Sequence, residues 1–428
     1  MHLLPLTRTL SAGLTRLCLI VCLPLIMILT SCHKTVQSGA NKTLDLPAGS
    51  PAVITAGNQF ALNFFGSVLQ QDTASDNKLI SPFSIYMALS MVYNGSAGAT
   101  SDSMAKTLAL TGISTTELND VSKALIQQLP LEDSKVNLSI ANSLWYQQNG
   151  PQPVPDFLNI ITGDYSGYIQ SLDFSSPSSL TTINSWVAAK TDNKIPSILS
   201  SLSPENVMVL INAIYFNGAW QYAFDSANTR NSTFFLSNGT TTSVPFMSQQ
   251  VSLRWYQDPA YTLLELPYGS GNSFDMYVVM PANQQVSLGS FATSFSSSTW
   301  ADGLAHLDTQ TVNLYLPKWQ ASYVISDAKP ELAALGMGIA FGPGADFSAM
   351  FSTPEQISQV IHKAYIDVTE TGTQAAAATA VTTVTIVGPG TREIPTIMVD
   401  HPYLYFIVEK QTGAILFVGT MNNPSSQN

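Results

Sequence analysis

Charged side chains are scarce in this sequence of 428 residues. Asp, Glu, Lys and Arg make up 11% of it, whereas hydrophobic residues make up 45%. So much hydrophobic sequence can bury a large core, which excludes an intrinsically disordered chain. Basic residues are the scarcest, with 17 against 28 acidic residues and a net charge of −11. Nucleic acids and heparin-type polyanions, which bind clustered Lys and Arg, are therefore not expected as partners or cofactors.

Cysteine and histidine are also rare. Two of the three cysteines, Cys18 and Cys22, lie within an apolar run near the N-terminus, and Cys32 follows that run. This distribution excludes a framework of disulfides, so the folded domain must depend on its core. The histidines within the expected domain lack the spacing of metal ligands. We therefore expect neither a metal nor another cofactor.

Residues 1–31 are predicted to be a lipoprotein signal peptide. Arg8 and Arg16 precede an apolar run over 17–29. This run is too short to span a bilayer. The four residues Leu-Thr-Ser-Cys that end at Cys32 resemble the lipobox of bacterial lipoproteins, in which the cysteine becomes the lipidated first residue. An ordinary secretory signal is the alternative. We expect an exported protein anchored to a membrane, at the outer membrane, or at the cell surface or in the extracellular space.

A flexible tether is predicted over residues 32–55, because this stretch is polar and is broken by glycine and proline. One large domain is predicted over 56–428. The stretch over 207–220 is apolar enough to be a strand buried on both faces. Other strand patterns cover 137–145, 263–268, 274–280 and 311–319. Apolar residues at helical spacing predict helices over 60–68, 82–92, 100–110, 115–129, 157–165 and 181–189.

An uncharged stretch lies near the C-terminus, from Gly372 to Gly390; it is rich in small residues at first and ends in β-branched residues and a Gly-Pro-Gly break. As a strand it would place Thr373, Ala375, Ala377 and Thr379 on one face, because strand side chains alternate between faces. None of these side chains is bulky or charged, so the stretch could slide between two strands of an existing sheet. A flexible surface linker, or a helix begun by the four alanines, is the alternative.

The residues before this stretch, Val360 to Thr373, resemble the hinge of the serpins. In that family the equivalent of Glu370 opens the reactive-centre loop, and an Ala-rich run follows. Residues 81–85, Ser-Pro-Phe-Ser-Ile, are similar to the family's Ser-Pro-x-Ser-Ile motif, and residues 400–419 resemble its C-terminal hairpin. Such matches occur in the expected order from about residue 58 to residue 424.

The resemblance implies the fold class, which is α+β. A serpin fold has a large central, mostly antiparallel sheet, two further sheets, about eight or nine helices and an exposed reactive-centre loop. In this sequence the serpin domain would cover 56–428 and the loop would cover about 370–393.

The resemblance also assigns functional positions. The "shutter" beneath the main sheet would consist of Ser81, Ser84, Asn212 and His362. The "breach", where the loop first inserts, would contain Trp220 and an ion pair between Lys318 and Glu370. The hinge and the inserting part of the loop would consist of Glu370, Gly372, Thr373, Ala375, Ala376, Ala377, Ala378 and Thr379.

An inhibitory serpin is a suicide substrate whose cleaved loop inserts into the main sheet. The usual register places the P1 residue sixteen positions beyond Glu370, which gives the reactive bond Ile386–Val387. An aliphatic P1 residue implies elastase-like or subtilisin-like serine proteases as covalently bound partners, and a slip to Thr385 or Val387 would not change that class. Trypsin-like targets are not expected, because Arg392 lies outside this register. The resemblance implies a monomer.

Two other classes of function are alternatives. A non-inhibitory serpin would act as a binding module, and prolines or charges between Thr373 and Thr379 would favour it, but the sequence has none there. A serine hydrolase is suggested only by the Ser-x-x-Lys pattern at Ser103 to Lys106, which lacks its Lys-Thr-Gly partner. Gly-x-Ser-x-Gly and His-Glu-x-x-His motifs are absent from the sequence. An inhibitor rather than an enzyme is therefore predicted.

Overall fold

The structure, a computed structural model, describes residues 42–74, 76–269, 273–351, 353, 355–373 and 393–426. No helix among these residues has both the length and the apolar character that crossing a bilayer requires. The α-helices in the described ranges are α1 (Ser50–Gln71), α2 (Pro82–Tyr93), α3 (Gly98–Thr107), α4 (Thr115–Gln128), α5 (Pro155–Asp164), α6 (Pro177–Lys190), α7 (Leu288–Ser294), α8 (Ser297–His306) and α9 (Lys329–Leu332). Their number, nine within these ranges, confirms the expected helix content.

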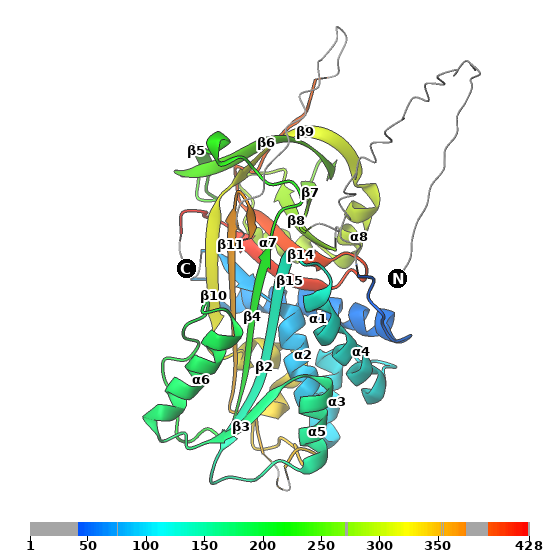
Figure 1. Cartoon of the computed structure of the whole chain (residues 1–428), viewed down its shortest axis with the longest axis vertical. Coiled ribbons are helices and arrows are strands. Elements are labelled where there is room, and N and C mark those ends of the chain that lie inside the picture. Colours follow the sequence, from blue (N-terminus) through cyan, green and yellow to red (C-terminus); the bar gives the residue numbers. More distant parts are fainter. Residues whose placement is uncertain are drawn as a thin grey trace, which may run out of the picture. The chain divides into compact units, whose positions relative to one another are not determined.

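A six-stranded sheet forms the centre of the molecule (Figure 1). Its order is β10-β11-β4-β2-β3, and β12 pairs with β11 outside this order. Three of its pairings are antiparallel, whereas β11 with β4 and β2 with β3 are parallel. The strands are β2 (Val136–Gln147), β3 (Tyr168–Leu172), β4 (Met208–Gly218), β10 (Trp319–Ile325), β11 (Gln359–Thr369) and β12 (Gly372–Thr373).

Both faces of this sheet are covered. Alternate residues of β4 point to opposite faces, so Leu210 packs into the large core with α1 and α2, while Ile211 packs into a second cluster. That second cluster includes Ile183 and Val187 of α6 and Trp145 of β2. Strand β4 is therefore buried on both faces, as its apolar sequence predicted.

The two further sheets that the resemblance implied are joined into one sheet of nine strands. The reason is the length of β6 (Thr241–Gln257), which pairs along most of its length with β5 and β9 and through its last three residues with β7. The order is β1-β15-β14-β8-β7-β6-β9-β13, with β5 beside β6. The other strands are β1 (Lys78–Ile80), β5 (Arg230–Phe235), β7 (Tyr261–Pro267), β8 (Phe274–Pro281), β9 (Asp308–Pro317), β13 (Thr396–Met398), β14 (Tyr403–Glu409) and β15 (Ile415–Met421).

The predicted tether over 32–55 ends earlier than expected. Helix α1 begins at Ser50, because Pro51 fits the first turn of a helix, where no backbone N–H is needed. Leu44 is buried, and its N–H and C=O both bond to the Gln411 side-chain amide, at 3.0 and 3.1 Å. Asp45 makes the same reciprocal pair with Gln128. Residues from Leu44 onward therefore belong to the folded domain.

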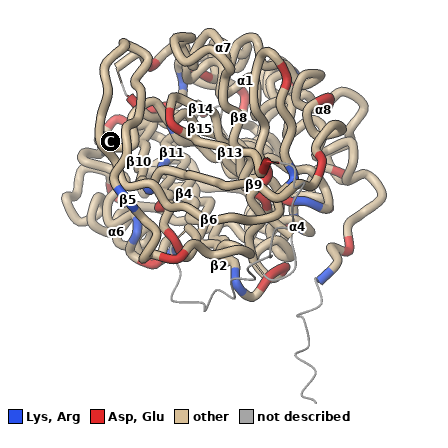
Figure 2. The backbone as a smooth tube through the Cα atoms, turned by 90° about the horizontal axis from the view of Figure 1, so that it is seen from above, with Lys and Arg blue, Asp and Glu red and all other residues tan. Residues whose placement is uncertain are grey.

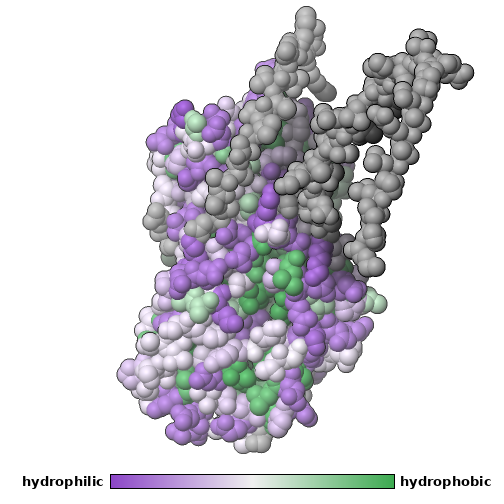
Figure 3. All heavy atoms as spheres, viewed as in Figure 1, coloured by the Kyte–Doolittle hydropathy of each residue, from purple (hydrophilic) through white to green (hydrophobic). Residues whose placement is uncertain are grey.

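The surface is polar but carries little charge. Viewed from above, Lys and Arg are scattered singly along the backbone and do not gather in one patch (Figure 2). The face seen in Figure 3 is mostly hydrophilic and is interrupted by small hydrophobic patches.

A close contact at Gly419 provides a test of the packing between β1, β14 and β15. A Cβ atom at this position would clash with the Lys78 carbonyl oxygen and the Tyr405 ring. We expect Gly419→Ala to lower the free energy of unfolding by about 1–3 kcal/mol, measured by denaturant unfolding. The control is Gly66→Ala in α1, where the added methyl meets no atom within 4 Å. This variant should gain about 0.5–1 kcal/mol, and equal stability of the two variants would contradict the packing described here.

Candidate functional site

The hinge glutamate is held by three contacts at the end of β11. Glu370 Oε2 lies 2.8 Å from Lys318 Nζ, and Glu370 Oε1 accepts a hydrogen bond of 2.9 Å from the Thr229 hydroxyl. Its backbone carbonyl accepts a bond of 2.8 Å from the Phe224 N–H. Burial raises the pKa of the Glu370 carboxyl, but the hydrogen bonds from Lys318, from the Glu370 backbone N–H and from Thr229, with the charge of Lys318, outweigh this effect and leave the pKa below its ordinary value.

Two residues near the start of the loop, Gly372 and Thr373, lie between two strands of the six-stranded sheet. Gly372 and Thr373 form β12, which pairs antiparallel with the end of β11, and Gly372 also bridges to Ala219 just beyond β4. Below this point β11 and β4 pair directly with each other, up to Tyr365 and Tyr215. The start of the loop therefore lies where an additional strand between β4 and β11 would begin.

Position 372 requires glycine. Its φ angle is +135°, in the region that other residues rarely adopt, and a Cβ atom would clash with the carbonyl oxygen of Gly218. The close approach of the chain to β4 at this point depends on the missing side chain.

Two aromatic side chains close the site above β12. The Trp220 indole N–H donates to the Thr369 carbonyl at 2.9 Å, and the Trp220 ring stacks on Tyr268 with centroids 4.4 Å apart. The hydroxyl of Tyr268 lies 2.8 Å from the Thr373 hydroxyl, and both residues are buried. The sequence did not reveal Tyr268 or Thr229 as site residues, because each is distant in sequence from the loop residue that it contacts.

The four predicted shutter residues lie together below the middle of the sheet. The Ser81 backbone N–H donates to His362 Nε2 at 3.0 Å, and His362 Nδ1 lies 2.7 Å from Asn212 Oδ1. The Asn212 side-chain amide donates to the carbonyl and hydroxyl oxygens of Ser84. Because Nε2 accepts a bond, the proton must be on Nδ1, so the imidazole is neutral.

A fifth residue belongs to this group and was not predicted. Asn142 Oδ1 accepts a bond of 2.6 Å from the Asn212 amide. Asn142, Asn212 and His362 occupy the same rung on β2, β4 and β11. This buried polar row therefore crosses the boundary between β4 and β11, and Ser81 and Ser84 fix it from below.

Several predicted residues lie outside the described part of the chain. These are the lipidation site Cys32, the reactive bond Ile386–Val387 and the inserting residues Ala375, Ala376, Ala377, Ala378 and Thr379. The exposed reactive-centre loop expected over about 370–393 is described only at residues 370–373 and 393.

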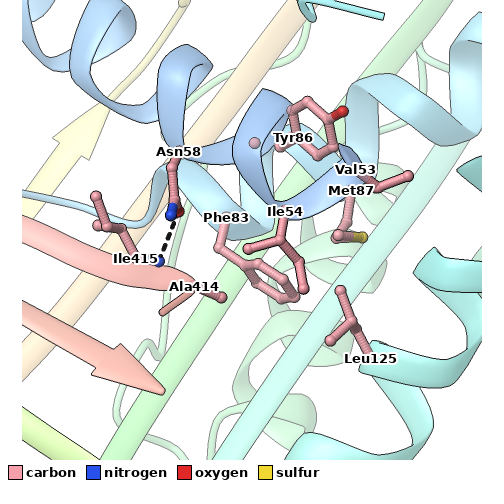
Figure 4. Close-up of a pocket in the computed structure, with 10 residues that line it drawn as sticks. Val53, Ile54, Asn58, Phe83, Tyr86, Met87, Leu125, Ala414 and Ile415 are labelled. Carbon is pink, nitrogen blue, oxygen red and sulfur yellow. Dashed lines mark hydrogen bonds between the residues drawn. The ribbon is translucent and has the colours of Figure 1, made fainter. Parts of the chain in front are cut away.

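A small cavity behind α2 shows no sign of a reactive site. Its lining comes from α1, α2, α4 and the start of β15, and it is almost wholly apolar (Figure 4). Asn58 is the amide in this lining, and its Oδ1 accepts a bond from the Ile415 N–H at 2.9 Å. Within the described ranges, no three His, Cys, Asp or Glu side chains are grouped so that they could hold a metal ion.

A family model described as "Serpin (serine protease inhibitor)" matches residues 55–424. The chain belongs to the serpin family. This match confirms the family inferred from the hinge and the scattered motifs, and it covers the described fold from α1 through β15. Members of this family are typically protease inhibitors and not enzymes.

Relatives with similar sequences occur in archaea and plants. A serpin-like protein of Thermococcus kodakarensis is 34% identical over 372 residues, which are 85% of this chain and 85% of that protein. Serpin-Z1C of Triticum aestivum is 32% identical over 385 residues, covering 86% of this serpin and 95% of the wheat protein.

Solved serpin structures are similar to this one over almost the whole domain. The native state of the thermophilic serpin tengpin matches with a TM-score of 0.78 and 31% identity, covering 86% of this chain and 94% of tengpin. Human thyroxine-binding globulin complexed with thyroxine matches with a TM-score of 0.80 and 28% identity, covering 89% and 100% of the two chains. These matches confirm the predicted α+β serpin fold.

The buried His362 provides a test of the shutter by pH. Burial lowers the pKa of His362 to about 3, from an unfolded value near 6.5. The stability gained from the neutral ring is present above about pH 6.5 and is lost as the pH falls toward 3, by at most about 1.4 kcal/mol for each pH unit. We expect this acid-side slope of the unfolding free energy to be smaller in His362→Gln.

The matched control is His306→Gln, because the His306 side chain is exposed. This variant should keep the slope of the unchanged protein. Equal acid-side slopes in His362→Gln and the unchanged protein would show that His362 does not carry the pH dependence.

Proposed function

We propose that this serpin is a suicide-substrate inhibitor of serine endopeptidases of the elastase-like or subtilisin-like class. The protease serine would attack the Ile386 carbonyl, forming an ester to Ile386 and releasing Val387 as a new N-terminal amine that takes up the proton. Insertion of the loop between β4 and β11 would then carry the bound protease away and distort it before water can cleave the ester. The insertion of a serpin loop into its own sheet is a known example of recognition by addition of a β-strand.

One observation supports this mechanism above all. Gly372 and Thr373 are already paired with β11 between β11 and the end of β4, and Thr373 is buried there. The remaining loop residues up to Thr379 are uncharged in the sequence, and all of them except Gln374 are small. An insertion that has begun at one end could continue down the sheet without burying a charge.

The proposed specificity rests on the loop sequence. The assigned P1 residue, Ile386, is aliphatic, so it fits a small or medium hydrophobic pocket. Strand β9, which pairs with β13 just after the loop, has no charged residue from Thr309 to Pro317. Charged residues do adjoin this stretch, namely Asp308 and Lys318 at the two ends of β9 and the exposed Glu393 after the loop, so the proposed specificity rests on the P1 residue.

A non-inhibitory binding module is the second candidate. It is favoured by the structural similarity to thyroxine-binding globulin, which was solved with bound thyroxine. The uncharged inserting loop argues for the inhibitor instead, because a serpin that never inserts its loop has no need of small residues at these positions.

Trapping can be tested with pancreatic elastase and subtilisin on a denaturing gel, using the chain without residues 1–31. We expect a band at the summed mass of the protease and residues 32–386 that requires the protease's active serine, and a released peptide that begins at Val387. Thr373→Arg should reduce the trapped fraction more than about tenfold in favour of simple cleavage, because an arginine cannot be buried unpaired beside Tyr268.

The matched control is Thr181→Arg, which adds the same charge at an exposed site on α6. It should trap the protease as well as the unchanged chain. Cleavage without a complex in the unchanged chain, with both proteases, would instead favour the binding module.

We infer that the mature protein is a lipoprotein held in a membrane through Cys32, at the outer membrane or the cell surface. The lipobox-like sequence supports this localisation. The tether between Cys32 and the first buried residue, Leu44, is short, so the inhibitor would act close to the membrane.

Lipidation can be tested in a bacterial host by labelling with a fatty acid and by fractionation. We expect Cys32→Ser to lose the label and to leave the membrane fraction, because the acylated sulfur is gone. Cys22→Ser, within the apolar run, should keep both. Retention of label and membrane association in Cys32→Ser would contradict the anchor.

A further inference from the structure

Four carboxyl side chains are buried close to the hinge. They come from four segments: Glu132 before β2, Glu265 in β7, Asp275 in β8 and Glu409 at the end of β14. We refer to these four residues as the carboxyl cluster. Buried carboxylates are stable only when cations or hydrogen-bond donors compensate their charge.

Two cations form ion pairs with Glu265 and Asp275 of the carboxyl cluster. Lys410 Nζ lies 2.9 Å from Glu265 Oε1 and 3.2 Å from Asp275 Oδ2. Arg254 Nη1 lies 2.6 Å from Glu265 Oε2. Glu265 therefore has both oxygens paired, and Asp275 has one.

Glu409 is compensated by donors in its own turn. Its Oε1 accepts a bond from the Gln411 N–H, and its Oε2 accepts bonds from the N–H and the hydroxyl of Thr412. These donors suit an ionised carboxylate. Burial nevertheless raises the pKa of Glu409 above its ordinary value, so Glu132 and Glu409 share one proton near neutral pH, and the donors around Glu409 favour Glu132 as the residue that holds it.

Among the described residues, no cation forms an ion pair with the carboxyl group of Glu132. Its carboxyl faces Glu409 and Ser273, and its Oε2 has no hydrogen-bond partner among the described residues. Burial, and then the neighbouring Glu409, raise the pKa of Glu132 to about 8. Burial and Glu265 raise the pKa of Asp275 to about 7, although Lys410 opposes this. At neutral pH the carboxyl cluster therefore holds a proton on Glu132.

Other ionisable groups also face the carboxyl cluster. Tyr277, in β8, places its hydroxyl 3.3 Å from Glu265 Oε2 and 3.5 Å from Asp275 Oδ2. Burial raises the pKa of Tyr277, and that of Tyr268 beside the hinge, above the ordinary tyrosine value, so both remain neutral. Asp133 adds a further carboxylate next to Glu132.

The segment that carries Glu132 also supports the hinge. The Lys135 carbonyl accepts a bond of 3.1 Å from the N–H of Ala219, the residue that bridges to Gly372. Asp133 packs against Gly269, whose N–H donates to the Ala219 carbonyl at 2.7 Å. Movement of residues 132–135 would therefore loosen Ala219 from two sides.

We propose that the carboxyl cluster is a proton-controlled brake on insertion of the reactive-centre loop. With a proton on Glu132, its carboxyl stays against Glu409, and residues 132–135 keep Ala219 and Gly372 in place. Loss of the proton places two negative charges together in a buried site and pushes residues 132–135 away from Glu409. The hinge then opens more readily. The proposal rests on the proposed function only because loop insertion is the event that it regulates.

The sign of the pH dependence follows from linkage. Opening frees Glu132 to ionise at its ordinary pKa of 4.5, whereas in the closed form ionisation requires about pH 8. The equilibrium constant for opening should therefore rise by up to about tenfold for each pH unit between about pH 5 and pH 8, and level off above that. Above that range both forms have lost the proton.

Hydrogen exchange on the chain without residues 1–31, followed by mass spectrometry from pH 5 to 9, tests this proposal. The reporters are the N–H groups of Trp220 and Phe224, which bond to the carbonyls of Thr371 and Glu370. After correction for the intrinsic exchange rate, the opening equilibrium constant measured at these two N–H groups should rise between about pH 5 and pH 8 and be constant above pH 8. The N–H of Asn313, which bonds to Pro395 away from the carboxyl cluster, should not.

Glu132→Gln removes the ionisation and should abolish the rise at both reporters. The matched control Glu205→Gln, at an exposed position, should retain it. A flat response in the unchanged protein, or a rise that persists in Glu132→Gln, would overturn the proposal. If the variant does not fold, the response of the unchanged protein still decides, because no rise means no brake. The experiment needs no protease, so its failure is distinct from a failure to trap one.

Discussion

Direct pairing between β4 and β11 is the constraint on which the functional parts of this structure depend. The parallel ladder runs over seven rungs, from Val209 with Gln359 to Tyr215 with Tyr365. On its other side β4 makes eleven antiparallel rungs with β2. Parallel pairing is slightly weaker per residue, so the boundary between β4 and β11 is the easier one to separate. The hinge lies at one end of this boundary, and the polar row of His362 and Asn212 crosses it.

The polar row fixes how the strands align. His362, Asn212 and Asn142 are buried on one rung of otherwise apolar strands, and each has a hydrogen-bond partner. A slip of one residue would place these side chains among apolar neighbours and leave their polar atoms unpaired. A fully bonded row therefore favours a single register while the sheet remains closed. It has to be broken when the strands separate.

The sequence predicted most of the fold and part of the site. Helix spacing located α2 and α4, and the apolar run over 207–220 located β4, because these signals are local. Residues such as Asn142, Tyr268 and Thr229 were missed, because their importance comes from contacts across 70 to 141 positions. Pro51 was a local signal for the start of α1 that was overlooked, whereas the length of β6, which joins two sheets, depends on neighbours that no local pattern contains. The assignments at Ile386, Val387 and residues 375–379 remain predictions.

The nine-stranded sheet determines what a cut in the loop would leave behind. Residues after the loop contribute β13, β14 and β15, and β14 is fully buried between β8 and β15. The piece of chain beyond a cut would therefore stay in place as part of a two-chain molecule, and only denaturation would separate the pieces. The hinge, in contrast, would lose its covalent connection to β13. Cleavage would thus free the part of the loop that follows the hinge to move, and it would leave the fold of β13, β14 and β15 unchanged.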